Sequence, residues 1–191
     1  MKIAILSGEA FNRLIDSVKA FTSKTDYRPA LKLIQICFYA NTVKAVSYAV
    51  DGYRAAKETV QCETVEKDFS VFVSPPPVKA KKDERVAIMT DGEITDIEFR
   101  DMRFRTKRPD GEFMDCEKAL SGAMNREKQL QFGANVDFLI DALKSLKASG
   151  ATTQKPIIFE FRGETEAMIF RTDADNAKMV LPVRLQAKEV T

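Results

Sequence analysis

The sequence predicts an α+β protein in which antiparallel β-structure carries two similar helices on one face. Two observations lead to this fold class. An apolar pattern at helical spacing occurs twice, once within residues 11–21 and again within residues 136–146. Each copy follows a short apolar strand pattern, near residues 3–6 and 129–132, and precedes further strands. A duplicated β-α-β-β-β unit explains both observations.

The two helical copies share particular residues as well as a pattern. Leu14-Ile15-Asp16 recurs as Leu139-Ile140-Asp141, and Lys19 and Gly8 are matched by Lys144 and Gly133. The repeated apolar positions are Phe11, Leu14, Ile15, Val18 and Phe21 in the first copy, and Val136, Leu139, Ile140, Leu143 and Leu146 in the second. We therefore expect a single module over residues 1–191, with halves of about 1–66 and 125–191 around a β-rich middle segment, 67–124.

The first helix should begin at residues 7–9, where Ser7 can cap it, and continue to about residue 23. Tyr27-Arg28-Pro29 then breaks the helical pattern. Turn signals at Asn41-Thr42 and Asp51-Gly52 separate the strands that follow. The expected strands of this half span residues 31–40, 43–50 and 54–63.

The middle segment shows no convincing helical stripe between residues 68 and 120, so it should be β-structure. Ser74-Pro75-Pro76-Pro77 ends its first strand, because proline cannot donate to a ladder. The second helix should span about residues 135–147 and end at Ser149-Gly150. The expected strands are 69–73, 86–89, 94–99 and 102–106 in the middle, and 156–161, 167–171 and 178–185 after the second helix.

Composition excludes several classes of protein. The 191 residues are 45% hydrophobic and 30% charged with a net charge of +2, which indicates a soluble globular protein without a strong overall field. Cys37, Cys62 and Cys116 form no paired motif, so we expect neither a disulfide framework nor a zinc site. No histidine is present, which removes His-based catalysis and metal ligation. Without a membrane or signal pattern we expect a cytoplasmic protein with no membrane partner, no metal and no cofactor.

Three short motifs follow one another along the chain, and each has an ordinary structural explanation alone. Val50-Asp51-Gly52-Tyr53-Arg54 fits a hairpin with an exposed arginine. Asp110-Gly111-Glu112-Phe113-Met114-Asp115 fits a turn and a partly apolar loop. Val180-Leu181-Pro182-Val183-Arg184-Leu185 fits a strand at a sheet edge or bulge.

Together and in this order, the motifs resemble those of the bacterial sliding clamp, the β subunit of DNA polymerase III. That family carries a T-D-G-H-R-L turn, a D-G-x-F-P-D-Y segment and a final V-M-P-M-R-L strand. Residues 132–143, which begin Phe132-Gly133-Ala134-Asn135-Val136, also resemble the family's G-F-N-V-x-Y-L-x-D-A-L helix start. The resemblance covers most of the chain and implies a DNA-clamp (processivity) fold, which would explain the repeat.

The resemblance implies a non-enzymatic DNA replication or repair accessory protein, a processivity factor that tethers partners to DNA. Its helices would face double-stranded DNA without sequence preference, since phosphate attraction fixes no register. The DNA-facing candidates are Arg13, Lys19, Lys24, Lys144 and Lys147. DNA polymerase or other replication proteins would insert short apolar peptides into a groove. Carried over by motif, the peptide groove would use Asp51, Gly52, Tyr53, Arg54, Met114, Ala119, Val180, Leu181, Pro182, Val183 and Arg184.

The chain departs from the family pattern in ways that bear on this function. Tyr53 stands in place of the usual histidine, Met114 in place of a proline, and Leu181 and Val183 in place of methionines. Residues 186–191 extend past the family's usual last leucine and could cover the groove. The chain is also about half the length of the family's three-domain subunit, so a homo-oligomeric ring would need six copies or three, or no ring would form.

Two alternatives remain open. A clamp-fold decoy or regulator would bind replication-protein peptides without encircling DNA. An enzyme would need a site such as Cys116 beside Asp115 and Glu117, with a reactive thiol.

Overall fold

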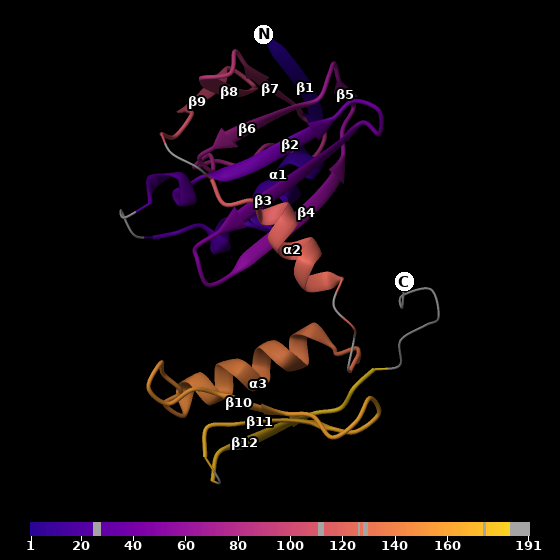
Figure 1. Cartoon of the computed structure of the whole chain (residues 1–191), viewed down its shortest axis with the longest axis vertical. Helices are drawn as coiled ribbons and strands as arrows, with labels where there is room; N and C mark the ends of the chain where they lie inside the picture. The colour runs from indigo at the N-terminus through magenta and orange to yellow at the C-terminus, as the bar shows by residue number, and fades with distance from the viewer. Residues whose placement is uncertain (25–27, 111–112, 126, 128–129, 174, 184–191) are drawn as a thin grey trace. The chain divides into compact units, whose positions relative to one another are not determined.

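A computed structural model describes residues 1–24, 28–110, 113–125, 127, 130–173 and 175–183 of the chain, with Ala119 described by its backbone only (Figure 1). The chain divides into two compact units, Met1–Asn125 (unit 1) and Arg126–Thr191 (unit 2). The expected middle segment belongs to unit 1, because its strands pair with those of the first half. The α+β class with antiparallel sheets is confirmed.

Unit 1 holds two helices and nine strands among its described residues. They are β1 (Lys2–Ser7), α1 (Gly8–Asp16), β2 (Ile34–Tyr39), β3 (Lys44–Val50), β4 (Ala55–Gln61), β5 (Thr64–Val65), β6 (Phe69–Val73), β7 (Arg85–Thr90), β8 (Ile94–Phe99), β9 (Met102–Lys107) and α2 (Cys116–Met124). Two 3₁₀ turns, Lys19–Phe21 and Pro29–Lys32, lie between α1 and β2.

The two sheets of unit 1 interlock. One has the strand order β5-β1-β7-β8-β9 and the other β4-β3-β2-β6. The first strand of each half therefore pairs with the second strand of the other half, β1 with β7 and β6 with β2. Where α1 connects β1 to β2, residues 74–84 connect β6 to β7 without a helix. Unit 1 thus contains two related halves, of which only the first has a helix between its first two strands.

Helix α1 forms as the sequence predicts but is shorter. Ser7 Oγ accepts the N–H of Ala10 at 3.2 Å, and Phe11, Leu14 and Ile15 are buried. The helix ends at Asp16 rather than near residue 23. Beyond it, the Ala20 carbonyl accepts an Arg54 N–H, and the Ser23 N–H donates to the Leu31 carbonyl. These bonds to other segments take the place of a continued helical ladder.

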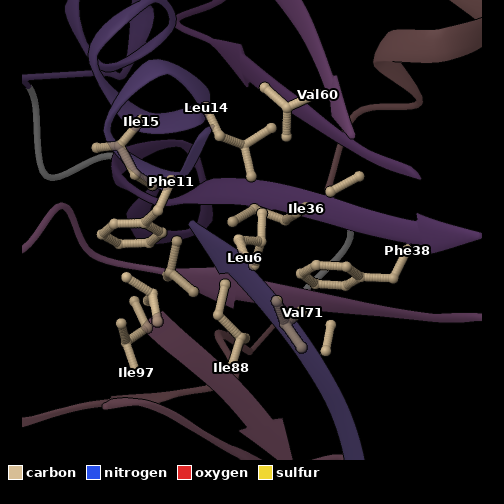
Figure 2. Packing of buried hydrophobic residues seen from close by; sticks show 14 of the residues in the cluster. Leu6, Phe11, Leu14, Ile15, Ile36, Phe38, Val60, Val71, Ile88 and Ile97 are labelled. Carbon is tan, nitrogen blue, oxygen red and sulfur yellow. The ribbon is translucent and has the colours of Figure 1, made fainter. Parts of the chain in front are cut away.

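The main core of unit 1 fills the space between α1 and the inner faces of both sheets (Figure 2). Leu6, Ile36, Ile88 and Ile97 are all fully buried there. A second cluster lies on the opposite face of β3, where Tyr48 and Val50 pack with Cys116. Strand β3 is therefore buried on both faces, and all of its residues except Lys44 are buried.

Helix α2 corrects the prediction that residues 68–120 contain only β-structure. Asp115 caps it by accepting the Lys118 N–H at 2.9 Å. Its apolar contacts to the second cluster come from Cys116 and Leu120, one helical turn apart, with Phe113 just before the helix. Two anchors are too few to form a helical stripe that stands out from the sequence.

Unit 2 contains α3 (Val136–Ala148) and the strands β10 (Ile158–Glu160), β11 (Met168–Arg171) and β12 (Ala177–Val180). Asn135 caps α3 through the N–H groups of Asp137 and Phe138. The helix packs on β11 and β12, and the core is Ala142, Leu146, Met168, Phe170 and Val180.

The ends of unit 2 differ from the predicted strands. Within the expected strand at 129–132, the structure describes residues 130–132 without strand pairing, and residue 129 lies outside the described part. A single antiparallel bridge joins Gly133 to Val183. Strand β12 ends at Val180, before Pro182, which has no N–H to donate. Residues 184–191 lie outside the described part of the chain.

Candidate functional site

The first part of the predicted site is a tight turn between β3 and β4 in unit 1. Asp51 Oδ1 accepts the N–H groups of Tyr53 at 3.0 Å and Arg54 at 2.9 Å. Gly52 has φ of +95°, which favours glycine at this position. These hydrogen bonds, first that of Tyr53 and then those of Arg54, hold the pKa of Asp51 below its usual value. The turn leaves the Tyr53 side chain 98% exposed.

Arg54 is held by Asp51 on the same turn and by two residues of the segment that follows α1. Its Nη2 donates to Asp51 Oδ2 at 2.7 Å and to the Ala20 carbonyl at 3.0 Å. Its guanidinium carbon lies 5.1 Å from the centroid of the Phe21 ring. The arginine therefore braces the turn against the segment that follows α1, and half of its side chain stays exposed.

The segment at residues 113–120 lies on the same face of the sheet as the ends of β3 and β4. Val50 and Ala55, which flank the turn, share the second cluster with Phe113 and Cys116. Phe113 also packs on Phe72, with ring centroids 5.2 Å apart. Met114, which follows Phe113 in the sequence, is 40% exposed. The residues that flank the turn and the residues of this segment therefore pack in the same cluster.

The second part of the predicted site is an open hollow of about 740 Å³ in unit 2, between α3 and the strand β12. Its β12 side consists of residues 177–183, which include the predicted Val180, Leu181, Pro182 and Val183. The α3 side consists of Phe138, Asp141, Ala142 and Ser145. Phe138, Met179 and Leu181 are each more than 60% exposed, and Val183 is 48% exposed. The hollow is thus mainly apolar, with a few polar groups.

The structure groups the predicted groove residues into these two sets, one in each unit. Arg184 lies outside the described residues, and the structure describes no side chain for Ala119. Sequence reasoning missed Phe138 and Met179, although Phe138 lies in the helix start that carries the resemblance. Their signal is an apolar residue at a helix or strand position that faces away from the core, which is visible only once the core is known.

The predicted DNA-facing cations differ in how they are paired. Arg13 Nη2 lies 2.7 Å from Glu58 Oε1, and Lys19 Nζ lies 2.5 Å from Asp16 Oδ1. Lys19, and then Lys79, lower the pKa of Asp16. Lys24, Lys144 and Lys147 are exposed, and no ion pair joins Lys144 or Lys147 to another described residue. The charges of Arg13 on α1 and of Lys19 in the 3₁₀ turn after it are therefore partly neutralised, whereas Lys144 and Lys147 on α3 have no ion-pair partner among the described residues.

Cys116 does not have the features of a nucleophile. Its side chain is buried in the second cluster, and burial, followed by the charge of Asp115, raises the pKa of its thiol to about 11. A thiol is reactive as the thiolate, which such a pKa disfavours at neutral pH. Among the described residues, no group of three or more His, Cys, Asp or Glu side chains could hold a metal ion. No described helix is long and apolar enough to cross a membrane.

No protein-family model and no curated protein matches the chain. Solved structures of sliding clamps do match it. The DNA polymerase sliding clamp of Bacillus subtilis superposes with a TM-score of 0.80 and 11% sequence identity, over 96% of this chain and 50% of that chain. A putative DNA polymerase III β subunit from Eubacterium rectale gives 0.75 and 15%, over 95% and 50%. The Helicobacter pylori β clamp bound to a DNA ligase peptide gives 0.72 and 14%, over 96% and 50%.

The chain therefore has the fold of the bacterial sliding clamps and spans about half the length of these clamp chains. The fold expected from the ordered motifs is confirmed.

Proposed function

We propose that this chain is a clamp-like accessory protein of DNA replication or repair that captures short apolar peptides of its partners in the hollow of unit 2. The hollow between α3 and β12 is the observation that carries the proposal. It lies on the strand whose motif resembles that of the clamps, and one clamp of the same fold was solved with a DNA ligase peptide. In this proposal, the peptides belong to DNA polymerases and other replication proteins.

The chemistry of the hollow suits a peptide with two or three apolar side chains. A volume of about 740 Å³ falls within the size usual for ligand sites, roughly 300–1,000 Å³. Phe138 and Leu181 supply exposed apolar walls, and each buried leucine of a partner would contribute about 1.5–3 kcal/mol. Asp141 and Ser145 supply polar groups that can orient the peptide backbone or a polar flank.

The turn in unit 1 is proposed as a second contact region for partners. Tyr53 offers an almost fully exposed aromatic ring, of the kind enriched in binding sites. Met114 offers a second apolar side chain, and the free half of the Arg54 side chain can meet an acidic flank. In this proposal Ala119 and Arg184 keep the peptide-contact roles that the resemblance implies.

Binding of a labelled peptide tests the proposal. The probe is the DNA ligase peptide of the Helicobacter pylori complex, measured by fluorescence anisotropy against the full chain and compared with a scrambled peptide. Leu181→Ala and Phe138→Ala should each weaken binding by about tenfold, because each removes a contact worth about 1.4 kcal/mol. Met124→Ala is the matched control, since Met124 is an exposed apolar residue, 75% accessible, on α2. Equal loss in all three variants, or equal binding of the scrambled peptide, contradicts the proposal.

We also propose a sequence-independent contact with double-stranded DNA through the exposed lysines. If Lys24, Lys144 and Lys147 each neutralise one phosphate, the logarithm of the binding constant should fall with the logarithm of salt concentration at a slope of about −2.7. Lys144→Glu combined with Lys147→Glu should reduce that slope by about two thirds. If the chain forms a homo-oligomeric ring, the ring would also retain DNA by encircling it.

The second candidate function is peptide capture without DNA, as a decoy or regulator. The ion pairs of Arg13 with Glu58 and of Lys19 with Asp16 favour it, because they partly neutralise two of the predicted DNA-facing cations. It predicts peptide binding that depends on Leu181, together with no salt-dependent affinity for DNA. The anisotropy and salt titrations therefore separate the two functions.

A further inference from the structure

Unit 2 repeats one half of unit 1. In unit 1, β1 precedes α1, the strands β2, β3 and β4 follow as a meander, and β5 returns to pair with β1. In unit 2, residues 130–133 precede α3, the strands β10, β11 and β12 follow as a meander, and Val183 returns to pair with Gly133. The other half of unit 1, β6 to β9, has no counterpart among the described residues of unit 2.

Two positions of the repeated helical stripe are buried in unit 1 and open in unit 2. Phe11 is 1% exposed and its counterpart Val136 is 64% exposed. The change at the second pair is similar, from 5% at Ile15 to 40% at Ile140. In unit 1 the second half supplies the cover, since the ring of Phe99 on β8 lies 6.1 Å from that of Phe11. Figure 2 shows Phe11 with Ile88 and Ile97 of the same cluster.

The first strand of the meander shows the same contrast. Strand β2 lies beside β6, and Phe38 stacks on Phe69 at 4.5 Å, so that Phe38 is 1% exposed. Strand β10 is an edge of its three-stranded sheet. Beside that edge Phe159 is 50% exposed and Phe161 is 42% exposed. An unpaired edge flanked by apolar side chains is a template for another strand.

Both open features lie on the same side of unit 2. At 100° per residue, Val136 and Ile140 share a flank of α3 that is opposite to Phe138 and Ser145, which line the hollow beside β12. The helix covers β11 and β12, so the Val136 flank is the one toward β10. Phe132 stacks on Phe161 at 4.9 Å, which places residues before α3 on this side too.

We propose that unit 2 pairs with unit 2 of a second copy of this chain about a two-fold axis, so that each covers the helix flank and the strand edge that are open on the other. Unit 1 provides the template, because its two halves exchange strands reciprocally, β1 to β7 and β6 to β2. In the pair, residues 130–133 of each copy lie along β10 of the other. Val136 and Ile140 of each copy then meet Phe159 and Phe161 of the other.

A second copy is the occupant that fits, because the open surface contains both partners of the exchange. A two-fold interface uses the same patch on both chains, so the patch must be self-complementary. Unit 2 has a helix flank that needs a strand cover and a strand edge that needs a pairing strand. The pairing is independent of peptide capture, which uses the opposite flank of α3.

The mass of the full chain in solution tests the proposal, by light scattering over a range of micromolar concentrations. Wild type should reach twice the 21.5 kDa chain mass. Ile140→Glu and Phe159→Glu should each halve the assembly or raise its dissociation constant by at least about tenfold, because a carboxylate would be buried without a partner. Met124→Glu is the control, since Met124 is 75% exposed on α2 in unit 1 and belongs neither to the pairing surface nor to the hollow.

Hydrogen exchange gives a second measurement on the same samples. The β10 amides, residues 158–160, should gain protection as the concentration rises in wild type and in Met124→Glu, but not in Ile140→Glu. Circular dichroism confirms that each variant is folded. Three results would overturn the proposal. Wild type could remain a monomer at every concentration, Ile140→Glu could leave the assembly intact, or the protection of the β10 amides could be independent of concentration.

Discussion

Truncation of the same residue at the two matched positions of the repeat tests the account of the core. Ile15 and Ile140 are the same amino acid in the same local sequence, but Ile15 is 5% exposed and Ile140 is 40% exposed. Ile15→Ala leaves a cavity among Phe11, Leu14 and the sheets, and should lower the free energy of unfolding of unit 1 by about 3 kcal/mol. Ile140→Ala should cost unit 2 about 1 kcal/mol or less in the unassembled chain.

Tyrosine fluorescence during urea unfolding makes this comparison specific to one unit. All four tyrosines lie in unit 1 and the chain has no tryptophan. With a slope of about 2 kcal/mol per molar urea, Ile15→Ala should lower the tyrosine midpoint by about 1.5 M. Ile140→Ala should leave that midpoint unchanged. Equal shifts in both variants, or a loss below about 1 kcal/mol for Ile15→Ala, would refute the assignment of Ile15 to the closed core.

Three further results are expected. Gly8→Ala should destabilise unit 1 by about 1–3 kcal/mol, because its Cβ would lie 1.9 Å from the Lys81 carbonyl oxygen; Gly122→Ala, in open space on α2, should be neutral or stabilising in the same urea assay. Tyr48→Phe should leave the unfolding free energy unchanged or raise it by about 1 kcal/mol, since the buried hydroxyl has no hydrogen-bond partner among the described residues; a clear loss by circular dichroism would reveal a partner. The Lys155 hydrogen bond lowers the pKa of Asp173 from 3.8 to about 2, so its stabilising effect is complete above about pH 4 and is lost as pH falls toward 2; an acid titration of Asp173→Asn should lack this component.

Regular periodicity was sufficient to predict most of the strands and two of the three described helices. In β8, Thr95, Ile97 and Phe99 alternate with Asp96 and Glu98, and the stripe that includes Leu14 and Ile15 forms α1. The end of α1 was wrong, because the bonds of the Ala20 carbonyl to Arg54 and of the Ser23 N–H to the Leu31 carbonyl come from segments distant in the sequence. Helix α2 was missed, because its packing on β3 depends on little more than Cys116 and Leu120.

The candidate site was predictable only where a local motif carries it. Asp51 to Arg54 form a turn as predicted, whereas the predicted strand at residues 178–185 ends at Val180 and residues 181–183 continue along the hollow. Phe138 was not predicted, because its exposure follows from which flank of α3 the sheet covers. The interlocking of β1 with β7 and of β6 with β2 was also beyond sequence reasoning, since strand exchange between halves depends on pairing partners rather than on periodicity.

Chemical-shift mapping of the peptide complex tests the central functional claim most directly. Labelled full-length chain is titrated with the DNA ligase peptide and the shifts of backbone amides are followed. The amides of Leu181 and Val183 on one side of the hollow, and of Asp141 and Ser145 on the other, should shift together with one dissociation constant. Shifts that leave these residues unchanged while others move, or no saturable shifts at all, would contradict a peptide-binding site between α3 and β12.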